Sequence, residues 1–420
     1  MRISIPICCL LSSFGLFLAS WSSAARAEEY LLHRFERIQL SDQFFCEGAS
    51  CGDFNQDGVT DIVSGPYWYA GPDYGHRQTV YPAKPFDING YSNNFLTFTQ
   101  DIDHDSWTDI VVIGFPDKQA YWYQNPHNKP GDWPRHLIYP VVGNESPTLA
   151  DVTGDGVPEL VFNTGGQLGY AQMDPNAPTH SWTFHPISPK GDFQRFTHGL
   201  GVGDVNGDGK PDLLEKNGWW EQPAAGRKQP FWAFHPVPFA KFGGAQMFAY
   251  DFDGDGDHDV VTSKSAHAYG LSWFEQVPAG DAIAFREHKI MGATAAENPY
   301  GVVFSQPHAM ALADMNGDGI ADLVTGKRFW AHNGHDPAAR EPAVIYWFQT
   351  VRESGSAHFI PHQIDRNSGV GTQVTAADVN GDHWPDVVVG NKKGTFVILQ
   401  HVQKVDQATW EAAQPKRLRP

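Results

Sequence analysis

The chain has 420 residues, of which 48 are acidic and 30 are basic, and its formal net charge at pH 7 is −18. This excess of negative charge makes nucleic acid a poor partner, because phosphate backbones are bound by basic side chains. Half of the acidic residues lie in seven short segments of one pattern. We therefore expect bound cations to offset much of the charge.

Residues 1–27 have the pattern of a secretory signal peptide. Arg2 precedes the apolar stretch IPICCLLSSFGLFLA, and the small-residue motif ARA ends at Ala27. We expect cleavage after Ala27 and export to the periplasm or the extracellular space. No later stretch of the sequence is long and apolar enough to span a bilayer, so we predict no membrane span.

Two cysteines remain after cleavage, Cys46 and Cys51. On one extended strand they would lie roughly 16 Å apart at ~3.3 Å per residue. That separation is too long for a disulfide bond. We interpret both as small core residues, and a disulfide across a bend is the alternative.

Seven copies of the pattern D-x-[DN]-x-D-G-x-x-D, or close variants, start 47 to 64 residues apart. A period of this size indicates repeated supersecondary units. Each copy leads into a short β-branched run such as DIVSG, and in most units an aromatic pair such as Trp68-Tyr69 follows. Next comes an aromatic residue with histidine three positions later. With the strand that enters the loop, each unit has four strands, which predicts an all-β fold, a seven-bladed β-propeller over residues 28–405.

The recurring histidines are expected to serve the architecture, through packing and hydrogen bonds between blades. They are His136, His185, His235, His288 and His362. The seventh unit lacks this fourth strand, and we expect residues 31–40 to supply it and to close the ring, which removes exposed sheet edges. Residues 406–420 are predicted to be a loose tail. We expect a monomer.

The acidic loops have the ligand spacing of a calcium site. Positions 1, 3, 5 and 9 offer side-chain oxygens, position 7 a backbone carbonyl, and glycine at position 6 permits the turn. This all-oxygen set suits Ca²⁺, with Mg²⁺ as a competitor, and metal-free Asx turns are the alternative. Ser106 and His383 replace the glycine in two loops, and Thr153 and Glu159 are weaker ligands in a third. The expected ligands are Asp53, Asn55, Asp57, Asp61, Asp101, Asp103, Asp105, Asp109, Asp151, Thr153, Asp155, Glu159, Asp204, Asn206, Asp208, Asp212, Asp251, Asp253, Asp255, Asp259, Asp314, Asn316, Asp318, Asp322, Asp378, Asn380, Asp382 and Asp386.

A second metal site is expected at the top of the central channel. Six residues before the first aspartate of their loops stand Glu47, Glu145, His198 and His308. At one register of a propeller these side chains converge, and imidazole with carboxylate is a ligand set for a transition metal such as Zn²⁺. The alternative is a water-filled polar channel without catalytic purpose.

A basic arc is expected beside this site. Lys216, Lys264, Lys327 and Lys392 follow their loops at similar distances, and around them are His267, Tyr269, Arg328, His332 and His335. Such an arc attracts anions or polarised carbonyl oxygens and offers general acids or bases. A solvated rim is the alternative. The candidate catalytic residues are His198, His308, His267, Lys327 and His332.

The repeats resemble FG-GAP/VCBS repeats, the calcium-loop propeller units of integrin α-subunits, over residues ~30–400. More narrowly, NGWWEQP, SAHAYGLSWFEQ, SQPHAMALAD and GKRFWAHNGHDP resemble the propeller domain of the aldos-2-ulose dehydratases. That resemblance implies an enzyme that dehydrates and isomerises oxidised sugars and carries metals in its propeller. The cupin-type domains of those enzymes have no counterpart in these 420 residues.

Two functions follow from these patterns. The first is an exported lyase or isomerase that acts on an oxidised sugar. The second is a non-enzymatic platform, stiffened by calcium, for a glycan, another small polar ligand or a protein partner. Propellers host both classes, so the fold does not choose between them. The distinctive His, Lys and Arg residues of units four to six favour the enzyme.

Overall fold

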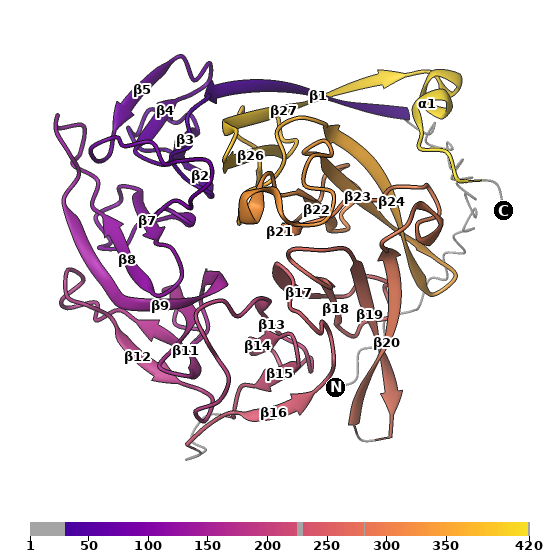
Figure 1. Cartoon of the computed structure of the whole chain (residues 1–420), viewed down its shortest axis with the longest axis horizontal. Helices are drawn as coiled ribbons and strands as arrows, with labels where there is room; N and C mark the ends of the chain where they lie inside the picture. The colour runs from indigo at the N-terminus through magenta and orange to yellow at the C-terminus, as the bar shows by residue number, and fades with distance from the viewer. Residues whose placement is uncertain (1–29, 225–229, 281, 419–420) are drawn as a thin grey trace, which may run out of the picture.

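The computed structural model describes residues 30–224, 230–280 and 282–418. The expected signal peptide, residues 1–27, lies outside the described residues. Within them the chain is almost entirely β-structure, and its strands are arranged around a common centre (Figure 1). In the described ranges, no helix has the length and apolar character needed to cross a membrane.

The strands group into five hydrogen-bonded sheets. The first contains β2 (Ala49–Gly52), β3 (Asp61–Ser64), β4 (Tyr67–Ala70) and β5 (His76–Thr79). The second, of seven strands, contains β6 (Leu96–Gln100), β7 (Asp109–Ile113), β8 (Lys118–Tyr123), β9 (Arg135–Ala150), β10 (Glu159–Thr164), β11 (Gln167–Gln172) and β12 (Thr183–Pro186). The third, of eight strands, contains β13 (Leu200–Gly203), β14 (Asp212–Glu215), β15 (Gly218–Glu221), β16 (Ala233–Pro236), β17 (Gln246–Tyr250), β18 (Asp259–Ser263), β19 (Leu271–Ala279) and β20 (Ala282–Met291).

The remaining two sheets have four strands each. One contains β21 (Pro307–Ala313), β22 (Asp322–Lys327), β23 (Ile345–Glu353) and β24 (Ser356–Asp365). The other contains β1 (Tyr30–Ser41), β27 (Gly394–Val405), β26 (Asp386–Asn391) and β25 (Thr375–Ala377). The short helical elements are η1 (Ala295–Glu297), η2 (Ala331–Gly334) and α1 (Gln407–Ala413).

The two large sheets are each built from two four-stranded units. Strand β9 pairs with β8 through its first half and with β10 through its second half, so two units share it. In the eight-stranded sheet, Leu200 and Gly201 of β13 pair in parallel with Gln246 and Met247 of β17. All other strand pairs in both sheets are antiparallel, as in successive hairpins.

Each acidic loop connects the first two strands of a unit, as expected. The last acid of the loop begins the second strand, and it is buried at β3, β7, β10, β14, β18, β22 and β26. Its carboxylate accepts the backbone N–H of the second loop residue, for example Val205 to Asp212 at 3.0 Å. The buried β-branched residues that follow pack between neighbouring sheets, which is the environment in which such side chains favour strands.

The N-terminal strand lies at the position expected for it. β1 pairs with β27 in antiparallel register from Tyr30 opposite Val405 to Ser41 opposite Thr395. Figure 1 shows the two strands side by side at the edge of the molecule, so that the two ends of the chain share one sheet. The outer edge of β27 is therefore covered.

Residues 406–418 form a docked segment, whereas the sequence predicted a loose tail. Asp406 caps α1 by accepting the N–H of Thr409 at 2.8 Å. The ring of Trp410 lies 5.6 Å from the ring of Tyr30. Further on, the N–H of Leu418 donates to the carbonyl of Pro299 at 2.7 Å. The composition of the tail is polar, but a capped helix and an aromatic contact hold it against β1.

The recurring histidines pack as predicted, within their own blades. Each ring lies 4.1–5.3 Å from the ring of an aromatic residue on the adjacent strand, as in Trp219 with His235. The expectation of hydrogen bonds between blades is wrong for His235, whose Nε2 lies 2.8 Å from Glu221 on the neighbouring strand of the same unit. Cys46 and Cys51 are free, so the disulfide alternative is excluded.

Candidate functional site

Four segments bring a group of three histidines and one glutamate together. Glu145 lies on β9 and His308 on β21, while His198 precedes β13 and His267 follows β18. Strands β13, β17 and β21 are among the innermost strands of the ring (Figure 1). Backbone pairing fixes two of the segments, since the N–H of Glu145 donates to the carbonyl of Thr197 at 2.9 Å.

The ligand atoms of this four-residue group all lie within 4.8 Å of one another. The Nε2 atom of His198 is 3.1 Å from Nε2 of His267 and 3.4 Å from Oε1 of Glu145. Nε2 of His308 lies 3.2 Å from Oε2 of Glu145. We name Glu145, His198, His267 and His308 the histidine cluster.

The outer nitrogen of two cluster histidines is already occupied. Nδ1 of His198 lies 2.8 Å from the carbonyl oxygen of Phe196, which can only accept, so Nδ1 carries the proton. Nδ1 of His267 lies 3.0 Å from the carboxylate of Asp336. With both rings neutral, the two Nε2 atoms present lone pairs to each other, and a proton on either nitrogen makes the contact a hydrogen bond. This arrangement, with a partner on the far nitrogen of each ring, is typical of metal-binding histidines.

His308 is fully buried; its Nδ1 has no hydrogen-bond partner, and its Nε2 has only the carboxylate of Glu145 nearby, at 3.2 Å. Burial, helped by the positive charge of Arg328, holds the pKa of His308 well below its usual range, so the ring is neutral at pH 7. Burial acts to raise the pKa of Glu145, but the neighbouring His198 and His308 outweigh it and hold that pKa well below its usual range. A neutral imidazole and an ionised carboxylate are the forms that bind metal.

Asp336 connects the histidine cluster to a fifth imidazole. Its second oxygen lies 2.9 Å from Nδ1 of His332, whose ring centre is 4.4 Å from that of His267. The His332 side chain is 52% exposed, in contrast to the cluster. Trp330, His332 and Asn333 have positive φ angles of 58°, 46° and 55°. Strained backbone of this kind is concentrated at functional sites.

Sequence reasoning missed Asp336. It lies four residues after His332 in a loop whose path the repeat pattern does not specify. The only sequence feature that pointed to Asp336 was its position close to the candidate His332, in an unusually long segment between two acidic loops. Its pKa is lowered to about 2: burial opposes the shift, and the hydrogen bonds from His267 and His332 produce it.

Glu47 was expected in the metal site, and the structure places it in an ion pair instead. Its carboxylate is bound by Arg328, and both side chains are 1% exposed. Nη1 of Arg328 also lies 3.9 Å from Oε2 of Glu145. A buried guanidinium needs a carboxylate partner, which accounts for the diversion of Glu47 away from the histidine cluster. Arg328 was expected near the site as part of the basic arc, but its ion pair with Glu47 was not anticipated.

Two of the four lysines of the basic arc are not exposed at a rim. Lys327 and Lys392 are buried, and burial lowers the pKa of each to about 8. Nζ of Lys327 lies 3.3 Å from Oγ of Ser305, and Lys392 donates to the carbonyl of Trp330 at 3.1 Å. Lys264 forms an ion pair with Glu287 at 2.9 Å. Each of these three lysines is therefore engaged by a neighbouring oxygen atom.

Gln246 and Gln373, which stand five residues before the first aspartate of their loops, do not join the histidine cluster. Gln246 accepts the N–H of Met310 at 2.9 Å and donates to the carbonyl of Thr372 at 3.1 Å. Gln373 makes two hydrogen bonds to the backbone of Thr97, at 2.8 and 2.7 Å. They connect inner strands of different sheets.

The acidic loops hold their carboxylates in a common geometry. In the loop from Asp204, the two oxygens of that residue accept the N–H groups of Asp208 and Gly209 at 3.1 and 2.8 Å. Carboxylate oxygens have further lone pairs, so these bonds orient the group without excluding a cation. Ligand atoms approach within 4.8 Å of one another in two groups of the described loops, Asp101 with Asp103 and Asp109, and Asp251 with Asp253 and Asp255.

Two features of these loops fit a bound cation. Oδ1 of Asp103 is buried without a hydrogen-bond partner. Burial also raises the pKa of the carboxyl groups at position nine, to about 7 for Asp109 and to about 8 for Asp322. Uncompensated negative charge is therefore unfavourable at these positions, and an oxygen-lined site of this kind suits Ca²⁺.

Comparison with known proteins identifies the repeats. The FG-GAP-like repeat matches residues 101–162, and the FG-GAP repeat matches residues 370–399. Both matches include acidic loops described above. The chain is thus an all-β protein with FG-GAP repeats and a β-propeller-like arrangement of sheets.

Several solved structures are similar to this chain at low identity. An Agrocybe aegerita lectin that recognises non-reducing terminal N-acetylglucosamine is 18% identical, with a TM-score of 0.48, and the match covers 88% of this chain and 86% of the lectin. The exotype rhamnogalacturonan lyase YesX is 12% identical, with a TM-score of 0.43 and coverage of 86% and 72%. The V. cholerae biofilm matrix protein Bap1 is 11% identical, with a TM-score of 0.39 and coverage of 91% and 89%.

Proposed function

We propose that this protein is an exported, calcium-binding, seven-bladed β-propeller that acts as a lyase or isomerase on an oxidised sugar. In this proposal β1 closes the ring, residues 1–27 are the signal peptide, and the acidic loops hold Ca²⁺. A transition metal such as Zn²⁺ is bound by Glu145, His198, His267 and His308. The substrate class rests on the resemblance of the segments around His267, His308 and His332 to the aldos-2-ulose dehydratases.

One observation carries the metal part of the proposal. The Nε2 atoms of His198 and His267 face each other at 3.1 Å while their Nδ1 atoms are engaged elsewhere. Two facing lone pairs repel each other unless positive charge lies between them. A metal ion supplies that charge, and when bound it also polarises a carbonyl or hydroxyl oxygen as a Lewis acid.

The reaction class is elimination of water from a sugar that carries a carbonyl group. A C–H bond next to the carbonyl breaks, a C=C bond forms, and the hydroxyl group on the next carbon leaves as water after protonation. His332 is the candidate base, because Asp336 holds its Nδ1 and its ring is exposed. Lys327, with a pKa lowered to about 8 by burial, is the second candidate for proton transfer.

The alternative is a non-enzymatic platform for a glycan or a protein. It is favoured by the burial of the histidine cluster, in which the side chain of His198 is 11% exposed and that of His308 is 0% exposed. Four protein ligands without an open position are typical of structural zinc sites. In that case the metal fixes the centre of the ring and takes no part in a reaction.

Metal analysis combined with a substrate assay tests the proposal. The purified full chain is assayed by elemental analysis, and an aldos-2-ulose is followed by NMR for loss of the C–H proton and appearance of a vinyl proton. Near-stoichiometric transition metal together with turnover supports the enzyme. Stoichiometric metal without turnover of aldos-2-uloses supports the platform. Absence of transition metal after growth with Zn²⁺ contradicts both forms of the proposal.

A further inference from the structure

A separate cavity lies at the outer edge of the ring, where the two ends of the chain meet. It has a volume of about 570 Å³ and is bordered by β1, β23, β24, α1 and the acidic loop at residue 316. Figure 1 places β1, β24 and α1 at the periphery, away from the innermost strands. Cavities of this size hold small organic ligands.

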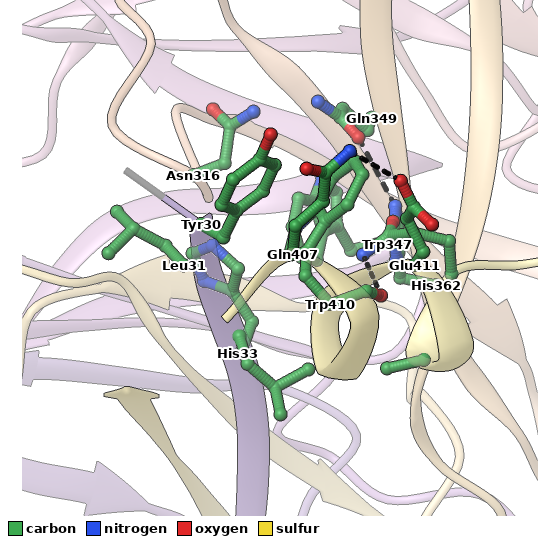
Figure 2. A pocket seen from close by; sticks show the side chains of 13 residues that line it. Tyr30, Leu31, His33, Asn316, Trp347, Gln349, His362, Gln407, Trp410 and Glu411 are labelled. Atoms are coloured by element: carbon green, nitrogen blue, oxygen red, sulfur yellow. Dashed lines mark hydrogen bonds between the residues drawn. The ribbon is translucent and has the colours of Figure 1, made fainter. Parts of the chain in front are cut away.

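Aromatic rings form much of its lining. Tyr30 from β1 and Trp410 from α1 are partly exposed, with ring centres 5.6 Å apart and an interplanar angle of 50°. Trp347 lies buried at the base and stacks on His362 at 4.4 Å. Figure 2 shows Tyr30 and Trp410 from the two ends of the chain at one opening. Flat apolar faces at a partly exposed position are suited to the C–H face of a sugar ring.

The polar groups of the cavity are mostly side-chain amides. Asn316, Gln349 and Gln407 are visible around the opening in Figure 2, and Gln414 completes the set. An amide both donates and accepts hydrogen bonds, as a sugar hydroxyl does. Among the described residues that line the cavity, Glu411 is the one carboxylate and no lysine or arginine is present. The cavity therefore favours a neutral polyhydroxy ligand over an anion.

The floor of the cavity belongs to the repeat, and its roof does not. The floor residues Trp347, Gln349 and His362 repeat the arrangement of Trp219, Glu221 and His235 in the fourth unit. The roof comes from the chain ends. α1 brings Trp410 and Gln407, and Leu418 anchors the following segment to Pro299. The cavity arises only where these termini cover a blade edge.

We propose that this cavity is a second ligand site, which binds a neutral saccharide of one or two sugar units. The sugar ring stacks on Trp410 and Tyr30, and its hydroxyl groups pair with the amides of Gln407 and Gln414. This site is independent of the histidine cluster. It anchors the protein on a glycan and performs no reaction.

The test measures saccharide binding to the full chain. Cellobiose, maltose and lactose are the neutral probes, a galacturonic acid disaccharide is the acidic control, and saturation-transfer NMR is the readout up to about 10 mM. We expect saturable binding of at least one neutral probe and weaker binding of the acidic one. Trp410→Ala lowers the affinity about tenfold or more, while Trp410→Phe, which keeps a stacking ring, stays within about threefold of the wild type.

Two controls separate the possible causes of a loss. Gln407→Ala changes a hydrogen-bonding group on an exposed position of α1, so it weakens binding while limited proteolysis shows that the tail stays docked. The double variant His198→Ala/His308→Ala binds the saccharide like the wild type, because the cluster is elsewhere. The inference is overturned if no neutral probe binds, if the acidic disaccharide binds as well as the neutral ones, or if Trp410→Ala and Gln407→Ala both bind like the wild type.

Discussion

The side chains of His198 and His267 meet through their Nε2 atoms at 3.1 Å, although the two residues come from different four-stranded units. Nδ1 of His198 contacts the carbonyl oxygen of Phe196, and Nδ1 of His267 contacts the carboxylate of Asp336. Second partners of this kind fix both the orientation and the tautomer of a ligand histidine. The pair is therefore prepared for a positive charge at its centre.

We expect the removal of two imidazoles of the cluster to abolish binding of the proposed transition metal. We expect His198→Ala/His308→Ala to lose the metal and any lyase activity, with the calcium-dependent part of the melting curve nearly unchanged. The matched control is His136→Ala/His288→Ala, which also removes two histidines but leaves the cluster intact. Elemental analysis of the folded proteins checks the prediction, and equal metal content in both double variants contradicts it.

Asp336→Asn keeps the shape of the side chain but removes its charge. Loss of a partner behind a ligand histidine typically costs 10–100-fold in metal affinity, and we expect a loss in that range. Glu341→Gln, in the same connection between β22 and β23, is the control and keeps the affinity. His332→Ala separates the two roles of the loop: it retains the metal and loses turnover. If Asp336→Asn binds metal like the wild type, Asp336 has no positioning role.

We expect removal of the proposed calcium ions to destabilise the fold. A ligand that binds only the native state contributes about 2.7 kcal/mol per site at 100-fold excess over Kd. A strong chelator therefore lowers the Tm substantially, as measured by calorimetry. Asp208→Ala or Asp318→Ala costs more than Thr153→Ala, because aspartate at position five is an expected ligand of a complete loop and threonine at position three is a weak one. A melting curve that excess chelator leaves unchanged is incompatible with structural calcium.

Deletion of residues 28–40 removes β1 from β27 and exposes sheet edges, so we expect aggregation and rapid proteolysis. Deletion of residues 406–420 removes a docked helix, and we expect a measurable but smaller loss of Tm, because Trp410 contacts Tyr30 and Leu418 contacts Pro299. Light scattering and calorimetry compare the two truncations. If both behave alike, β1 does not close the ring.

Protonation of His362 makes the protein less stable in acid. Burial lowers the pKa of His362 to about 4, from its ordinary value of 6.5. The unfolded chain therefore binds this proton more readily, and the free energy of unfolding falls as the pH drops from above 7 towards 4. The linkage amounts to about 2 kcal/mol at pH 5. His362→Gln removes this pH-dependent contribution to the free energy of unfolding. The wild type therefore loses its advantage in stability over the variant, or becomes the less stable of the two, as the pH falls. A difference independent of pH from 7.5 to 5 contradicts the assignment.

The sequence by itself determined the local structure and its repetition. Each acidic loop ends in an aspartate or glutamate that begins a buried strand, and the aromatic pairs and histidines lie on the strands predicted for them, as in Trp219 opposite His235. These features depend on contacts between residues that are close in the chain. The same pattern occurs in several units, so it could be recognised from the sequence. The same register also singled out Glu145, His198 and His308, because equivalent positions of repeated units come together around one centre.

Tertiary structure alone decided the partners at the centre and at the chain ends. Glu47 shares the register of Glu145, but Arg328 from a distant unit forms an ion pair with it, since a buried guanidinium needs a carboxylate. Asp336 reaches His267 because the long connection between β22 and β23 folds back over the centre. Trp410 meets Tyr30 only when the two ends of the chain share one sheet. Each of these contacts joins residues far apart in sequence and outside the repeat, so no spacing encodes it.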